Sequence, residues 1–402
     1  MSTTTDHLAE ELRDRMIAEV QASGSRTTRV LDAMAAVRRE PFLPDANLEE
    51  VYDPHKAVVI KRDDGGAIGS CSSVPTLVAT MLDQLRPQLG HNVLEIAAGT
   101  GINAAYLREL VGPTGSVTTI DHDPGVTAHA RAALHAAGYP DVEVITRDGA
   151  LGDQAHGPYH GIIVTVGAPD VYPAWREQLL PRGRLLVPLR FRGTTRSLGL
   201  TLEGDTFISD TAELCGFIPM IGHDGERTAA IDPDGLVSLY WDPDQDIDPG
   251  GLADVLVQPR TEAWSGEFVG NEEPFDGVWL RLAATEPGTC RITAAQAASE
   301  LGLCTPGILS RSPAIAEGSS LAYFALRRMP HHPDGPRSEL GAIGHGPKGA
   351  QLAHRFRDQI CAWGANRTIT PTITIYLAGT PAAKIPSRLI IDKPNTRISI
   401  SY

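Results

Sequence analysis

The chain has 402 residues, of which 42% are hydrophobic and 21% charged, proportions that are ordinary for a folded globular protein and exclude extensive disorder. Because this length exceeds one ordinary hydrophobic core, we expect two domains. The formal net charge of −14 gives no attraction to phosphate backbones, so nucleic acid is not an expected partner.

The first ninety residues are predicted to be mainly helical. Apolar side chains recur three to four positions apart in residues 8–20, 28–37 and 74–85, which indicates three helices. Residues 53–69 show no such period and are expected to be irregular.

A regular alternation begins at residue 93. Strands are expected at 93–97, 116–121, 142–148, 161–167 and 183–189, and helices at 103–110, 126–137 and 172–180. The strands are apolar on both faces, which predicts a parallel sheet covered by helices on both sides.

This alternation of strands and helices stops after about residue 222. Residues 223–250 are rich in Asp, Gly and Pro and are interpreted as a linker or surface excursion. Beyond them we expect strands at 278–283 and 321–327, a helix near 348–363, and closing strands that include a hairpin at residues 393–395. The predicted domains are therefore 1–222, divided into N-terminal helices (1–90) and an α/β core (91–222), and an α+β extension (223–402).

Cysteine usage and hydropathy bear on the compartment. The five cysteines are scattered and include no Cys-x-x-Cys pair, which predicts reduced thiols rather than a disulfide framework or a zinc site. No segment has the apolar length of a signal core or membrane span. We therefore expect a cytoplasmic protein without a membrane partner, and no bound metal, since no cluster has ligand spacing.

A glycine loop follows the first strand of the core. It contains Gly99 and Gly101 and leads into a helix, so a ligand can approach the backbone closely and meet the free N–H groups of the helix N-terminus. Asp121 ends the next strand, where a carboxylate can accept both hydroxyls of a ribose. These features indicate a nucleoside cofactor.

Two further acidic positions favour S-adenosyl-L-methionine as that cofactor. Glu95, just before the loop, would repel a pyrophosphate but attract the ammonium of a methionine moiety. Asp148, followed by Gly149, ends the third strand and can accept from an adenine amino group. The spacing Gly99-x-Gly101-x-x-Ala104 also fits a dinucleotide fingerprint, and a purely structural role of the acidic strand ends is the other alternative.

Taken in order, these segments resemble the protein-L-isoaspartate (D-aspartate) O-methyltransferase family over residues 8–222. SSVPTLVATML (72–82) is similar to its Ser-x-Pro motif and VLEIAAGTGINAAYL (93–107) to its cofactor loop. VITRDGALG (144–152) is similar to its adenine-side Asp-Gly, and CGFIPMIG (215–222) to the segment that closes its catalytic domain. The chain departs from the family at Ala97, which replaces the usual first glycine of the loop, and at Thr76, where many relatives have His or Tyr.

The resemblance implies a class I S-adenosylmethionine-dependent methyltransferase, Rossmann-like with a mainly parallel sheet, plus the extension. It implies that Ser73 lies where the substrate carboxylate meets the methyl donor. Ser72 would contact both cofactor and substrate, and Thr76 the substrate. A carboxylate is ionised at neutral pH, so methyl transfer to it requires no strong base.

The extension resembles that of a subfamily found beside ribosomally made, modified peptides such as lanthipeptides, lasso peptides and graspetides. On this basis we favour methylation of an Asp side chain in a constrained ribosomal peptide, with collapse of the ester to a succinimide or isoAsp. Repair of isoAsp in damaged proteins is the alternative, and a non-catalytic cofactor-binding partner protein is a third reading.

Overall fold

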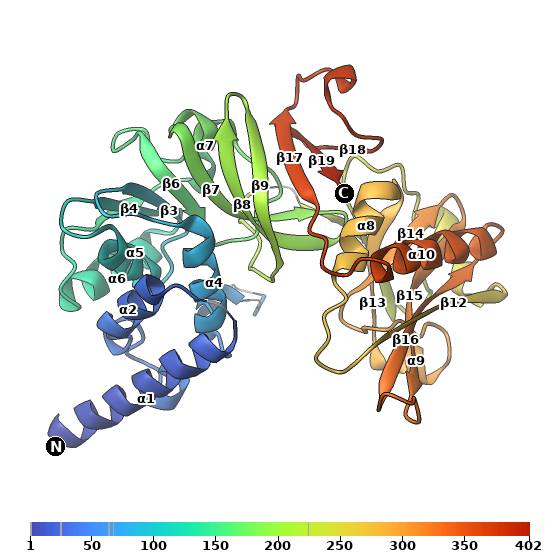
Figure 1. Cartoon of the computed structure of the whole chain (residues 1–402), viewed down its shortest axis with the longest axis horizontal. Helices are drawn as coiled ribbons and strands as arrows, with labels where there is room; N and C mark the ends of the chain where they lie inside the picture. The colour runs from blue at the N-terminus through green and yellow to red at the C-terminus, as the bar shows by residue number, and fades with distance from the viewer. Residues whose placement is uncertain (1, 25, 63–64, 67, 224) are drawn as a thin grey trace. The chain divides into compact units, whose positions relative to one another are not determined.

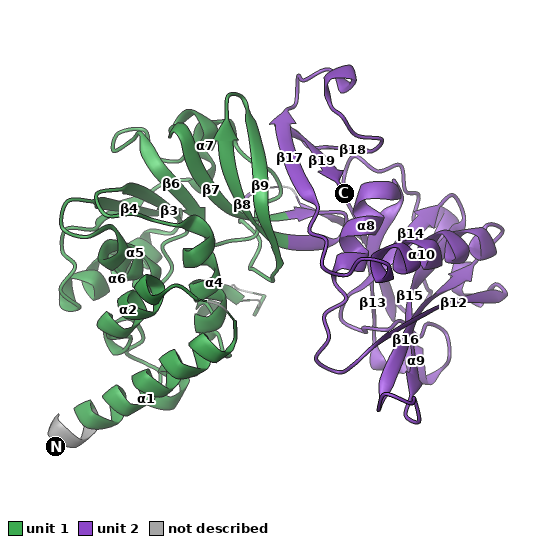
Figure 2. Ribbon diagram, viewed as in Figure 1, with its two compact units in different colours: residues 1–189, 196–221 green, residues 190–195, 222–402 purple. Residues whose placement is uncertain are grey.

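The computed structural model describes residues 2–24, 26–62, 65–66, 68–223 and 225–402, which form two compact units (Figure 2). Unit 1 comprises Met1–Leu189 and Arg196–Ile221, and unit 2 comprises Arg190–Thr195 and Gly222–Tyr402. The short segment Arg190–Thr195 is tied into unit 2 by hydrogen bonds, two of which involve the backbone of Arg192. The backbone N–H of Arg192 donates to Asp242 (2.8 Å), and the Trp279 indole donates to the Arg192 carbonyl (2.9 Å).

The N-terminal part of unit 1 combines helices with one β-hairpin (Figure 1). Its elements are α1 (Ser2–Ala22), α2 (Thr28–Ala36), α3 (Leu48–Val51), β1 (Val58–Arg62), β2 (Ile68–Ser72) and α4 (Pro75–Leu85). The three predicted helices are confirmed. The expectation of irregular structure at 53–69 is wrong at 58–62 and 68–69, where β1 and β2 pair antiparallel, while residues 63, 64 and 67 lie outside the described residues. Strand β1 is largely exposed and therefore lacks the apolar alternation that reveals a half-buried strand.

The remainder of unit 1 is an α/β sheet. Its strands are β3 (Asn92–Ile96), β4 (Ser116–Asp121), β5 (Glu143–Thr146), β6 (Tyr159–Val164), β7 (Leu179–Phe191), β8 (Thr194–Glu203) and β9 (Thr206–Leu214), and its helices are α5 (Ile102–Val111), α6 (Pro124–Ala136) and α7 (Pro173–Glu177). The order within the unit is β9-β8-β7-β6-β3-β4-β5, with parallel pairs from β7 to β5. The predicted α/β class with a mainly parallel sheet is confirmed.

Strand order places a crevice at one edge of this sheet. β3 pairs with β4 on one side and with β6 on the other, because the chain builds β4 and β5 before it returns to β6. Ligands of such sheets bind beyond the carboxyl ends of the strands, at the point where the strand order reverses. Helices α5 and α6 pack against β3, β4 and β5 and form part of the main core of unit 1.

Unit 2 is built on an antiparallel sheet of seven strands, in the order β10-β11-β13-β14-β15-β16-β12. These strands are β10 (Arg227–Ala230), β11 (Val237–Trp241), β12 (Arg260–Val269), β13 (Thr289–Ala294), β14 (Ser312–Glu317), β15 (Ser320–Met329) and β16 (Arg337–His345). The other elements are α8 (Gly277–Thr285), α9 (Gln296–Glu300), α10 (Gly349–Gly364), β17 (Thr372–Leu377), β18 (Ile390–Asp392) and β19 (Thr396–Ser401). Side chains of α8 and α10 share one apolar cluster with this sheet.

Two sequence-based expectations for this unit are wrong. Residues 223–250 are not a linker, since they contain β10 and β11, and Val237, Leu239 and Trp241 are buried. Residues 278–283 belong to helix α8 rather than to a strand. A short apolar run such as Val278–Ala283 has no period that separates a buried helix from a buried strand. The predicted strand at 321–327, the helix at 348–363 and the C-terminal hairpin are confirmed.

The packing of α10 on the sheet predicts where unit 2 is most sensitive to substitution. Phe356 is fully buried and stacks near Phe324, with 6.3 Å between ring centroids. We expect Phe356→Ala to lower the free energy of unfolding by about 3–5 kcal/mol through the cavity it leaves. Urea unfolding followed by tryptophan fluorescence reports on this unit, which holds four of the five tryptophans: Trp241, Trp264, Trp279 and Trp363.

The matched control is Leu301→Ala, because Leu301 is 73% exposed and its truncation should change stability by less than about 0.5 kcal/mol. Equal effects of the two substitutions would contradict the packing described for α10.

Candidate active site

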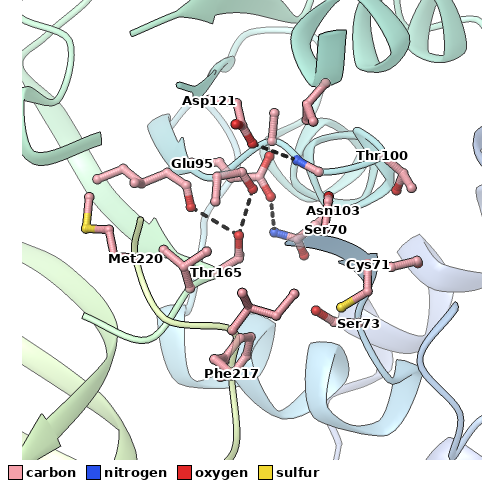
Figure 3. Close-up of a pocket in the computed structure, with 18 of the residues that line it drawn as sticks. Ser70, Cys71, Ser73, Glu95, Thr100, Asn103, Asp121, Thr165, Phe217 and Met220 are labelled. Carbon is pink, nitrogen blue, oxygen red and sulfur yellow. Dashed lines mark hydrogen bonds between the residues drawn. The ribbon is translucent and has the colours of Figure 1, made fainter. Parts of the chain in front are cut away.

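A cavity of about 760 Å³ opens at the carboxyl ends of the parallel strands in unit 1 (Figure 3). One side, the hairpin wall, consists of Ala57, Lys61, Arg62 and residues 69–74 from β1, β2 and the approach to α4. The other side, the sheet wall, consists of residues 95–100, 102–103, 120–123 and 148–149. Residues 163, 165–166 and 216–221 also line it, and Leu77, Val78 and Met81 of α4 and Val126 of α6 complete the lining. Sequence segments that lie far apart along the chain therefore meet around one space.

The loop after β3 has the left-handed backbone that close approach to a ligand requires. Ala97, Gly99 and Gly101 have φ angles of 77°, 53° and 86°. Ala97 adopts this conformation although it carries a Cβ atom, so the departure from the usual glycine is accommodated with local strain. Gly99 borders the cavity. At Gly101 a Cβ atom would lie 3.2 Å from the Ala130 carbonyl oxygen, so Gly101 faces α6 instead and allows the two helices to approach.

Glu95, the residue before the last in β3, is a buried carboxyl group of the sheet wall. It is 1% exposed and accepts hydrogen bonds from Asn103 Nδ2 (2.7 Å) and Thr119 Oγ1 (2.6 Å). Burial raises its pKa to about 7, and the nearby Asp121 adds to this rise, while the two hydrogen bonds oppose it. Both partners are neutral. A cation arriving in the cavity would therefore favour the ionised form of Glu95.

Asp121 lies at the end of the neighbouring strand β4. One carboxylate oxygen accepts from the Gly99 N–H (3.3 Å), and the other accepts from the Asp123 N–H (3.1 Å). Each oxygen retains accepting capacity for a further donor. The adjacent strand ends therefore hold two carboxylates, Glu95 and Asp121, on one wall of the cavity.

Asp148 and Gly149 reach the cavity from the end of β5. Asp148 is exposed and caps the short 3-10 helix Gly149–Leu151 by accepting from the Ala150 N–H (2.9 Å). Gly149 is buried, and a Cβ atom there would lie 2.6 Å from Ile96 Cγ2. Gly149 thus adds no side chain to the wall, and Asp148 presents a carboxylate beside it.

The hydroxyl residues before α4 occupy three different environments. Ser73 is half-buried and lines the cavity between β2 and the proline that begins the helix. Ser72 also lines it, but is buried and accepts from Arg39 Nη2 (3.4 Å). Thr76 lies in the first turn of α4, where its N–H donates to the Pro54 carbonyl (3.2 Å), and it is not among the described residues of the lining.

Several residues of this site were not predicted from the sequence. Asn103 and Thr119 hold Glu95, and Thr165 Oγ1 donates to the carbonyls of Ile96 (3.1 Å) and Ala97 (2.8 Å), which fixes the start of the loop. No pattern in the sequence distinguishes these polar residues from other strand and helix positions. The segment 216–221 did carry a signal, since CGFIPMIG was already noted for its resemblance, but it was given no role in the site.

No helix in the described part of the chain combines the length and apolar composition needed to cross a membrane. No group of three or more His, Cys, Asp or Glu side chains within that part is arranged to hold a metal ion.

Fold and site together define a class I S-adenosylmethionine-dependent methyltransferase. The acidic ends of β3, β4 and β5 offer acceptors for an ammonium, a ribose and an adenine amino group, and the glycine loop leaves the backbone accessible beneath them. The residues present therefore fit the cofactor.

The comparisons with known proteins define the family. The family model for protein-L-isoaspartate(D-aspartate) O-methyltransferase matches residues 11–225, more than half of the chain. The protein-L-isoaspartate O-methyltransferase of Methanopyrus kandleri is 34% identical over 226 residues, which cover 55% of this chain and 96% of that protein. The enzyme of the same name from Methanoregula boonei is 36% identical over 225 residues, covering 55% and 98%. The chain belongs to this family of S-adenosylmethionine-dependent carboxyl O-methyltransferases.

One solved structure extends the similarity of fold beyond unit 1. A chain described as protein-L-isoaspartate O-methyltransferase is 18% identical, with a TM-score of 0.50, and the match covers 97% of this chain and all of that one. The curated relatives match only about half of this chain.

The buried carboxyl of Glu95 predicts a pH dependence of stability. Between about pH 4.5 and 7 the folded protein keeps a proton on Glu95 that the unfolded chain has released, so the contribution of Glu95 to stability falls as the pH rises. We expect the free energy of unfolding of the wild type to fall by about 3 kcal/mol across this pH window. The Glu95→Gln variant should show no such fall.

Urea unfolding at about pH 5 and about pH 8 measures the difference, with Glu49→Gln, at an exposed site, as the control. If the free energy of unfolding changed equally with pH in Glu95→Gln and in the wild type, Glu95 would not be titrating in this range.

Proposed function

We propose that this protein methylates a carboxylate of an isoaspartyl residue in a peptide or protein, with S-adenosyl-L-methionine as methyl donor. The observation that carries this proposal is the cavity, which unites Ser73 of the hairpin wall with Glu95, Asp121 and Asp148 of the sheet wall. The family and the names of the relatives support the isoaspartyl acceptor.

The sheet wall would hold the cofactor. When bound, S-adenosyl-L-methionine supplies a methyl group activated by its sulfonium centre. Glu95, in its ionised form, would bind the ammonium of the methionine moiety, and Asp121 would accept the ribose hydroxyls. Asp148 and Gly149 would lie along the adenine, and Gly99 would let the backbone approach. Gly101 supports this wall through its contact with α6.

The hairpin wall would hold the acceptor. A carboxylate is ionised at neutral pH, so Ser73 needs only to orient it by donating a hydrogen bond, and no residue has to remove a proton. Catalysis then consists of alignment and the exclusion of water. Ser72 would take part in this contact, and Thr76 would act from the first turn of α4, where it remains a prediction.

The product of the transfer is chemically unstable in a peptide. Methoxide leaves an ester far more readily than oxide or hydroxide leaves a carboxylate, so the following backbone nitrogen can attack the ester carbonyl. Methanol leaves, the nitrogen loses its proton, and a five-membered succinimide forms. Hydrolysis of that ring gives aspartate or isoaspartate, which is the basis of repair.

A second candidate is modification of an ordinary Asp in a constrained ribosomal peptide, the reading that the sequence favoured. Its support is unit 2, most of which lies outside the family match and outside the curated relatives. However, a solved structure with the isoaspartate enzyme's name matches the fold over 97% of this chain. An extension of this kind therefore does not separate the two candidates, and we place the isoaspartyl acceptor first.

Ser73 gives a direct test of the acceptor side. Loss of one hydrogen bond to a charged group should lower kcat/KM for the peptide about 10- to 100-fold in Ser73→Ala. Steady-state kinetics with a linear isoAsp peptide measure the effect. The control is Ser116→Ala, whose hydroxyl bonds Asn92 Oδ1 (2.7 Å) at the opposite, amino end of β4. Wild-type kinetics in Ser73→Ala would remove this residue from the mechanism.

Mass spectrometry with two peptides distinguishes the candidates. One peptide is linear and contains isoAsp, and the other is cyclised and contains ordinary Asp. We expect a methyl ester, or the succinimide derived from it, on the linear peptide. Modification of only the cyclised peptide would favour tailoring instead. Absence of reaction with both, in protein that binds S-adenosylhomocysteine, would contradict carboxylate methylation by this site.

A further inference from the structure

Arg39 is a buried cation with neutral partners only. Its side chain is 1% exposed. The guanidinium donates to the Val51 carbonyl (2.6 Å), to Tyr106 Oη (3.0 Å) and to Ser72 Oγ (3.4 Å). It forms no ion pair with any carboxylate in the described part of the chain. Burial of an uncompensated charge is unfavourable, so a guanidinium kept in this state calls for an explanation beyond packing.

The position of Ser72 connects this cation to the cavity. Ser72 lines the hairpin wall directly before Ser73. Because its oxygen accepts from Arg39, its own hydrogen is directed elsewhere, and it is donated to no acceptor in the described chain. A carboxylate bound to that hydroxyl at about 2.7 Å would lie within about 6 Å of the guanidinium. At that separation, away from water, opposite charges attract appreciably.

The two walls of the cavity carry opposite charges. Glu95, Asp121, Asp123 and Asp148 belong to the sheet wall, whereas Lys61 and Arg62 belong to the hairpin wall. Lys61 pairs with Asp123, while Arg62 donates to the Gly66 carbonyl (3.0 Å). A cationic methyl donor and an anionic acceptor would each meet the wall of opposite charge.

We infer that Arg39 is a positioning residue that acts through Ser72 to select a carboxylate over a neutral group as the methyl acceptor. This inference rests on the proposed function and adds to it the residue that recognises the acceptor's charge. Arg39 itself does not line the cavity among the described residues, so it acts by orienting the Ser72 hydroxyl and by its field.

The test compares two peptides that differ only at the acceptor group. One is the linear isoAsp peptide, and the other carries a carboxamide in place of its free carboxylate. Affinities are measured by titration calorimetry in the presence of S-adenosylhomocysteine, so no turnover interferes. In the wild type we expect the carboxylate peptide to bind more tightly. Arg39→Met should reduce this preference about 10- to 100-fold, by weakening the carboxylate peptide alone.

Further variants separate charge recognition from a structural role. Arg39→Lys keeps the charge and should retain part of the preference. Arg29→Met is the matched control, because Arg29 donates to the carbonyls of Pro87 (2.9 Å) and Leu110 (2.7 Å) and does not line the cavity. Equal weakening of both peptides and of S-adenosylhomocysteine in Arg39→Met would mean that Arg39 is structural, which overturns the inference.

The smaller change Ser72→Ala keeps the inference testable where Arg39→Met does not fold. Loss of the preference in Ser72→Ala supports it, and full retention overturns it. Failure of the role of Arg39 and failure of the proposed function are distinguishable. Methylation of the isoAsp peptide with an intact preference in Arg39→Met refutes only the role of Arg39. A wild type that neither binds nor methylates the carboxylate peptide refutes the proposed function, and the role of Arg39 with it.

Discussion

The site depends on two buried ionisable groups that the protein itself leaves without counter-ions. Glu95 is held by Asn103 and Thr119, and Arg39 by Val51, Tyr106 and Ser72, so every partner of either group is neutral. Buried ions in this condition weaken the folded state, and opposite charges brought by ligands relieve that cost. A cation beside Glu95 and a carboxylate beside Ser72 would supply those charges. Binding of the methyl donor and the acceptor would therefore supply the counter-charges that the folded protein lacks at Glu95 and Arg39.

The surrounding fold keeps these charges in place. Parallel pairing of β3 with β4 and β6 brings Glu95, Asp121 and Thr165 to the same edge of the sheet. Thr165 then bonds the carbonyls of Ile96 and Ala97, which holds the strained start of the glycine loop. Close approach of α5 and α6 at Gly101 supports the loop from behind. The backbone that must lie near a ligand is therefore over-determined by contacts that the ligand does not make.

Local pattern explains most of what could be predicted from the sequence. Strands β6 and β7 contain short uninterrupted apolar runs, and acidic residues at or just after the ends of β3, β4 and β5 mark the sheet wall. Strand β1 escaped prediction because it is exposed, and α8 because a short apolar run fits two structures. Arg39 could not have been recognised at all. Its significance arises from contacts with Ser72 and Tyr106, 33 and 67 residues away, which only the tertiary fold brings together.

Gly99 and Gly101 also show that a sequence motif does not determine the role of each residue in it. Sequence spacing treats Gly99 and Gly101 alike, as residues that let a ligand approach. In the structure only Gly99 borders the cavity, and Gly101 is required by a neighbouring helix. Both have left-handed backbone, so neither is explained by the motif alone. A glycine in such a loop indicates that something lies close, and the fold decides whether it is a ligand or the protein itself.

The residues of the cavity lie within one of the two units. The cavity residues that the structure describes all belong to unit 1, from the hairpin wall to the segment 216–221. The groups proposed for donor binding, acceptor orientation and charge selection are thus contained in the part of the chain that the family model matches. Unit 2 has its own sheet and its own apolar clusters, and it adds none of these groups. We therefore expect the type of acceptor to be set by the hairpin wall.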